Sequence, residues 1–163
     1  MAEPRIIQHK AIKMLGMKIS TNLAENRTRE LWRNFKPRVK EIKHRADKDY
    51  YSIQEYPKDI QMDKFTPHTQ FTKWAAVRVL DFDDIPPGMD QLIIPTGLYA
   101  IFIHKGPVRT FYKTSQYIYG QWLPGSDYLL DQRPQFEIMS EKYLGPDHPD
   151  SEEEVWIPIR PDL

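Results

Sequence analysis

The sequence predicts an α+β fold in which two β-α-β-β units form an antiparallel sheet with two main helices. Residues 5–80 and 91–160 each follow the order strand, helix, strand, strand. The chain near the C-terminus alternates apolar and polar residues, as half-buried strands do, while two other segments carry apolar residues at helical spacing. With 163 residues, 40% of them hydrophobic, the chain is long enough to bury a core. We expect a single domain over residues 1–163.

The helix of the first unit is expected to begin near Asn26 or Thr28, either of which can cap it. Apolar residues such as Leu31 and Phe35 then return on one face at near-helical spacing. Pro37 lies inside this pattern and should kink or split the helix. Around the helix we expect extended chain over residues 5–19 and strands over residues 50–56 and 71–80.

The helix of the second unit is expected to open at Gly106-Pro107, because proline is favoured in the first turn. Pro124-Gly125 should end it. The strands of this unit are predicted over residues 92–94, 98–103, 128–130, 135–143 and 154–160, with a bend at residues 95–97. The predicted inner face of the helix consists of Val108, Phe111, Tyr112, Ser115, Tyr119 and Trp122.

Charge and composition exclude several classes of function. Lysine plus arginine and aspartate plus glutamate each number 23, so no excess of charge draws the chain to nucleic acid or an anionic membrane. Cysteine is absent, which rules out disulfides and thiolate zinc sites and suits a reducing compartment. The five histidines lack metal-ligand spacing. We therefore expect no metal or cofactor. We also expect a cytoplasmic protein, since no signal peptide or membrane span is evident.

Glu137 is the leading candidate for a ligand-binding residue. Side chains alternate between the two faces of a strand, so Glu137 and Met139 share one face and Phe136 the other. In the next strand Ile157 and its aliphatic neighbours face away from Trp156. If helices cover the aliphatic residues, a carboxylate, a thioether and an indole lie together on the opposite face. Such a set is typical of a pocket for a flat, apolar and cationic molecule.

The duplicated order of elements predicts a groove between the two units. Aligning the units places Ser52 at the position of Glu137 and Trp74 at that of Trp156. We therefore expect one tryptophan from each half in the groove and a carboxylate from the second half only. Tyr112 and Tyr119 would either pack or reach the ligand through their hydroxyl groups.

Two interpretations of Glu137 remain open at this point. Burying a lone carboxylate costs several kcal/mol, so the group needs a partner or a raised pKa. A cationic ligand would be such a partner, with the two tryptophans adding cation–π attraction. The alternative is a structural ion pair with Arg133, Lys142 or Arg160.

Several motifs in this order resemble the GyrI-like effector-binding family. The family comprises small-molecule-binding modules of multidrug-responsive bacterial transcription activators and also free-standing proteins. The resemblance implies a duplicated β-α-β-β fold with a ligand groove, in which Glu137 meets cationic drugs and Trp156 lines the same groove. It rests on Leu98-Tyr99-Ala100-Ile101-Phe102 followed by His104-Lys105-Gly106, on Tyr119-Gly120-Gln121-Trp122-Leu123-Pro124, on Arg133-Pro134-Gln135-Phe136-Glu137 and on Ile157-Pro158-Ile159.

The resemblance therefore implies a stand-alone, non-enzymatic binding protein for amphipathic, aromatic or cationic small molecules. Direct binding to nucleic acid is not expected, since the sequence shows no winged or helix-turn-helix segment. One alternative is a hydrolase of small strained electrophiles, with Glu137 as general base. Another is a protein-interaction module whose partner would meet the acidic segment from Asp147 to Glu154.

Overall fold

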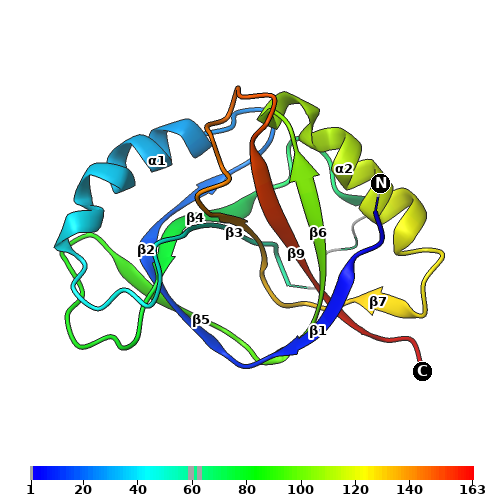
Figure 1. Ribbon diagram of the computed structural model, residues 1–163, viewed down its shortest axis with the longest axis horizontal. Helices are drawn as coiled ribbons and strands as arrows, with labels where there is room; N and C mark the ends of the chain where they lie inside the picture. Colours follow the sequence, from blue (N-terminus) through cyan, green and yellow to red (C-terminus); the bar gives the residue numbers. More distant parts are fainter. Residues whose placement is uncertain (1, 59–60, 62–63) are drawn as a thin grey trace.

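Figure 1 shows the computed structural model, which describes residues 2–58, 61 and 64–163. The described strands form one sheet of nine strands in the order β1-β6-β9-β8-β3-β4-β2-β5, with β7 paired to β9. All of these pairs are antiparallel. Two helices lie on the outer side of the sheet (Figure 1), so the predicted α+β class is confirmed.

The first half of the chain follows the predicted order of elements. Helix α1 stops at Phe35, and a 3-10 helix that contains Pro37 takes over at the next residue, so the predicted split of the helix is confirmed. The extended segment at the start is interrupted at residues 10–11. The elements are β1 (Arg5–His9), β2 (Ile12–Thr21), α1 (Thr28–Phe35), η1 (Lys36–Glu41), β3 (Tyr50–Glu55) and β4 (Phe71–Arg78).

The second half repeats this order, with the predicted bend between its first two strands at residues 95–96. Its last but one strand ends at Met139, four residues earlier than expected. The elements are β5 (Asp90–Ile94), β6 (Gly97–Lys105), η3 (Val108–Thr110), α2 (Phe111–Tyr117), η4 (Ile118–Trp122), β7 (Tyr128–Leu130), β8 (Gln135–Met139) and β9 (Glu152–Pro161).

The predicted inner face of the second helix is partly wrong. Val108 and Tyr112 are 59% and 56% exposed, whereas Thr114 and Ile118 are buried. The segment winds first as a 3-10 helix, then as an α-helix and then as a π-helix. Because these three forms differ in residues per turn, a face counted at 3.6 residues per turn loses its phase.

The sheet curls back on itself. β1 and β2 follow one another along the chain, as do β5 and β6, and β1 pairs with β6 while β2 pairs with β5. The resulting ring of strands encloses the main apolar core (Figure 1). The buried residues of this inner core are Ile12, Met14, Tyr51, Ile53, Trp74, Ala76, Ile94, Tyr99, Ile101, Phe136 and Trp156.

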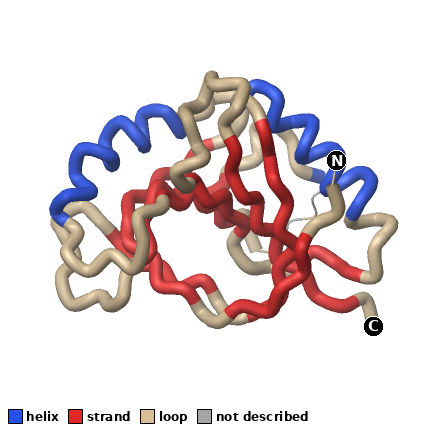
Figure 2. The backbone as a smooth tube through the Cα atoms, in the orientation of Figure 1, coloured by secondary structure: helices blue, strands red, loops and turns tan. Residues whose placement is uncertain are grey.

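Both helices pack on the outside of the curved sheet, apart from each other (Figure 2). Leu31 and Phe35 of α1 pack with Ala75 and Val77 of β4. The segment of α2 and η4 packs on β6 and β9 in a third cluster, which contains Val155. The middle of the outer face is formed by β3 and β8, and these two strands carry the candidate site.

Candidate functional site

Glu137 lies at the centre of the outer face. In the pair β3–β8, Ser52 is directly opposite Glu137. The next strands place Ala75 opposite Ser52 and Val155 opposite Glu137. Residues directly opposite each other in antiparallel strands share a face. Since Ala75 packs under α1 and Val155 under α2, Glu137 lies on the helix-bearing face, between the two helices.

The expectation that the tryptophans share this face with Glu137 is wrong. Trp156 is opposite Phe136, and Trp74 is opposite Ile53, so both indoles point into the inner core. Trp156 stacks on Phe136 with ring centroids 5.2 Å apart, and the two tryptophans are only 7% and 2% exposed. The alternation within each strand was predicted correctly. The register between strands, however, places Trp156 on the same face as Phe136, which is the face opposite to that of Glu137.

The alignment of the two halves shifts by two residues from the one expected. Ser52 pairs with Ala75 and Glu137 pairs with Val155, so Ala75 is the equivalent of Val155. Counting back two residues makes Lys73 the equivalent of Glu153. Residues two apart in a strand lie on the same face. Lys73 therefore shares the outer face with Ala75, and Glu153 shares it with Val155 and Glu137.

Gln54 and Lys73 are partners of the Glu137 carboxylate. The Gln54 side-chain amide donates a hydrogen bond to Glu137 Oε1 over 3.0 Å. Lys73 Nζ lies 3.9 Å from the same oxygen, and the side chains of Lys73 and Glu137 are only 10% and 13% exposed. The sequence did not suggest this lysine.

The ion-pair partners that the sequence suggested for Glu137 lie elsewhere. Arg133 Nε donates to Asp131 Oδ2 over 2.7 Å, and its Nη2 donates to the carbonyl oxygens of Leu98 and Ile159. Lys142 and Arg160 are exposed. A buried counter-charge for Glu137 was correctly anticipated as an alternative, but it comes from the first half of the chain.

The electrostatics of the site are dominated by burial. Burial raises the pKa of Glu137, an effect that the Lys73 charge and the Gln54 hydrogen bond partly offset. Burial likewise lowers the pKa of Lys73, against the attraction of Glu137 and Glu153. The pKa of Glu153 is raised to about 8, first by burial and then by the negative charge of Glu137. Two carboxyl groups and one amine thus share a poorly hydrated site.

Two tyrosines border the carboxylates. The Tyr119 hydroxyl donates a hydrogen bond to the side-chain carbonyl of Gln135, and burial raises the pKa of Tyr119 well above its usual value. The pKa of Tyr56 is raised by burial and by the charge of Glu137. Tyr56 and Gln135 also line a cleft of about 160 Å³ at one end of β3 and β8, together with residues that include Glu55, Lys58 and Arg133.

The other residues predicted to bind ligand are Met139 and Tyr112. Met139 lies on the same strand face as Glu137, opposite Tyr50, while Tyr112 is exposed on α2. Sequence reasoning missed Lys73 and Glu153, which strand alternation would have placed by their distance from Ala75 and Val155. It missed Gln135 and Tyr56 as well, because polar residues near strand ends carry no distinctive pattern.

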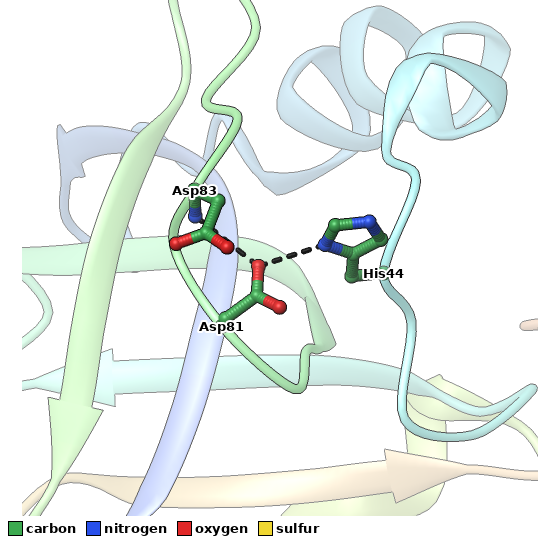
Figure 3. Close-up of side chains that lie close together, drawn as sticks. All are labelled: His44, Asp81 and Asp83. Carbon is green, nitrogen blue, oxygen red and sulfur yellow. Dashed lines mark hydrogen bonds and ion pairs between the residues drawn. The ribbon is translucent and has the colours of Figure 1, made fainter.

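A separate cluster lies on the surface, where the potential ligand atoms of His44, Asp81 and Asp83 come within 4.8 Å of one another (Figure 3). The His44 ring donates to Asp81 Oδ1 over 2.8 Å, and the Asp83 backbone N–H donates to the same oxygen over 3.2 Å. The hydrogen bond between His44 and Asp81, together with the charge of Asp81, raises the pKa of His44. These internal bonds account for the cluster without an ion.

None of the helices in the described part of the chain is long and apolar enough to cross a membrane.

The curved sheet with a polar centre between two outer helices matches a known class of ligand-binding domain. Residues 2–160 match the GyrI-like small molecule binding domain. The chain therefore belongs to the GyrI-like family of small-molecule-binding domains, as the sequence motifs implied.

Relatives of this chain include a regulator and two solved structures. The chain is 27% identical over 157 residues to the transcriptional regulator BrlR of Pseudomonas aeruginosa, covering 95% of this chain and 54% of BrlR. It thus spans about half the length of that curated relative. SAV2435 bound to tetraphenylphosphonium has a TM-score of 0.74 at 15% identity, covering 98% of this chain and 94% of that one. The EcmrR C-terminal domain has the same TM-score and identity, covering 98% of each chain.

Proposed function

We propose that this chain binds an amphipathic aromatic molecule, and cationic ones most tightly, between α1 and α2 above Glu137. The observation that carries the proposal is the concentration of Glu137, Lys73 and Glu153 in a poorly hydrated patch at the centre of the outer face. A buried ion pair is often no more stabilising than apolar residues of similar volume. Its presence at this place is therefore better explained by ligand recognition than by stability.

The likeness to SAV2435 supports the choice of ligand class. That protein has the same fold and was solved with tetraphenylphosphonium, a permanent aromatic cation. A cation of this kind has no hydrogen-bond donors, so it is held by apolar contacts, aromatic faces and negative charge. Tyr56, Tyr119 and Met139 supply such surroundings next to the Glu137 carboxylate.

The cleft beside Tyr56 and Gln135 gives the ligand a way in. Its volume of about 160 Å³ is smaller than the roughly 300 to 1,000 Å³ of pockets that hold drug-sized molecules. We therefore expect the tyrosine side chains to swing aside on binding. The Tyr119–Gln135 hydrogen bond would then be exchanged for contacts between the Tyr119 ring and the ligand.

The test is a calorimetric titration with tetraphenylphosphonium and with triphenylphosphine oxide, which keeps three of the four phenyl groups and is uncharged. We expect saturable binding of both, and Glu137→Gln should weaken the cation by roughly tenfold, about 1.4 kcal/mol, while leaving the neutral compound nearly unchanged. Glu152→Gln, which removes a carboxylate from the same region of β9, is the matched control and should affect neither. Absence of binding to both compounds would refute the proposal, and equal losses would show that Glu137 is structural.

A further inference from the structure

The site contains one more acidic group than basic group. Lys73 of β4, Glu137 of β8 and Glu153 of β9 are outer-face residues of strands that cross the centre of the sheet. Lys73 lies 3.9 Å from Glu137, so the lysine already balances one carboxylate. Glu153 is two residues from Val155, which is opposite Glu137, and such diagonal neighbours are within reach of long side chains.

We infer that Glu153 is the second carboxylate of the ligand site, and that a monocation binds there in exchange for a proton that Glu153 holds in the empty protein. This inference rests on the proposed function. It also makes Glu153 a second residue that favours a cation over a neutral molecule, beside Glu137, whose charge Lys73 offsets in part.

The charge balance follows from the geometry. With all three groups ionised, the empty site would carry one uncompensated negative charge away from water, which is costly. One proton on Glu153 removes that charge, in agreement with the raised pKa of about 8. An entering monocation supplies the same positive charge, so the proton leaves as the cation arrives and the site stays neutral.

Other titratable groups surround Glu153. His104 lies opposite Glu153 on β6, but its two ring nitrogens contact Thr114 Oγ1 at 2.7 Å and the Pro107 carbonyl oxygen at 3.2 Å. Burial and the charge of Glu153 raise the pKa of Tyr143 to about 12. Burial raises the pKa values of Tyr56 and Tyr119 as well, so these phenols stay neutral at physiological pH.

The experiment measures proton release when tetraphenylphosphonium binds. This cation has no ionisable group, so any proton released comes from the protein. In weakly buffered solution at pH 7 we expect close to one proton per bound cation and none for triphenylphosphine oxide. The Kd of the cation should tighten by roughly tenfold per pH unit up to about pH 8 and then level off, as a one-proton exchange requires.

Variants at position 153 assign the proton. Glu153→Gln should abolish proton release, flatten the pH profile of the Kd and weaken the cation at pH 8. Glu153→Asp keeps a carboxyl group and should retain proton release. In the empty protein, carbon-13 NMR of labelled glutamate should show one carboxyl resonance that titrates near pH 8 and is missing in Glu153→Gln.

The outcomes separate this inference from the proposed function. Binding of the cation without proton release, or the absence of the titrating carboxyl resonance, would overturn the role of Glu153 and leave ligand binding intact. Absence of binding by either compound would overturn both. A thermal melt of each variant shows whether it is folded before its binding is compared.

Discussion

Replacing Glu153 with glutamine should stabilise the empty protein at neutral pH. Glutamine keeps the shape and hydrogen-bonding capacity of the side chain but cannot ionise. In the native chain, folding places a carboxyl group where its charged form is disfavoured, while the unfolded chain ionises it freely. The variant is free of this penalty, so its free energy of unfolding should be higher than that of the native protein.

The magnitude follows from the shift in pKa. Folding raises the pKa of Glu153 from its ordinary 4.5 to about 8. At pH 7 the folded state therefore still holds the proton, whereas pH 7 is already 2.5 units above the pKa of the unfolded state. At 1.36 kcal/mol per unit the penalty is about 3 kcal/mol. We expect a gain of about 2 to 3 kcal/mol, because the side chain is partly exposed and water screens part of the effect.

The sign of the pH dependence is also fixed. The folded state binds more protons than the unfolded state between about pH 4.5 and pH 8, so native stability falls with rising pH across this window. The advantage of Glu153→Gln should therefore vanish near pH 4, grow through pH 7 and level off above pH 8. Urea unfolding at pH 4, 6, 7 and 8.5 measures it, with Glu152→Gln as control. A difference between variant and native protein that stays constant over this range would refute the reasoning.

Two further substitutions test the architecture around the site. Lys73→Met removes the buried ammonium that balances the charge of Glu137 and should cost about 3 kcal/mol at pH 7. Urea unfolding should show this loss shrinking at lower pH as Glu137 takes up a proton, and an undiminished loss at pH 5 would contradict it. Gly16→Ala would place a Cβ 2.0 Å from the Ala75 carbonyl oxygen and should cost about 2 kcal/mol or more, because β2 is forced away from β4. Gly120→Ala is the control: its added Cβ would have nothing within 4 Å, so it should not lower the urea midpoint.

Local patterns in the sequence predict most of the fold. Strand alternation and helical spacing indicated both helices, the split at Pro37 and the faces within each strand, because these features depend on residues close along the chain. The pairing of Phe136 with Trp156, and of Ser52 with Glu137, depends on register between segments far apart in sequence. No local pattern determines that register, so the tryptophans were assigned to the wrong face although their alternation was correct.

The same distinction explains which site residues were found. Glu137 was recognisable because it alternates with the apolar residues Phe136 and Ile138 in the predicted strand. Its partner Lys73 is adjacent to Trp74, and the sequence pattern favours the aromatic residue as the functional one. The contact between Lys73 and Glu137 joins the two halves of the chain, so only the assembled sheet reveals it.

The duplication of the fold leaves a centre whose two halves are chemically unequal. The first half contributes Ser52 and Lys73, and the equivalent positions of the second half carry Glu137 and Glu153. A symmetric centre would present the same charge from both sides and give a ligand no preferred direction. Here the negative groups lie on β8 and β9 and the positive group on β4, so the electric field runs across the site. An amphipathic cation bound above this centre would turn its charge towards β8 and β9 and its apolar end towards the first half.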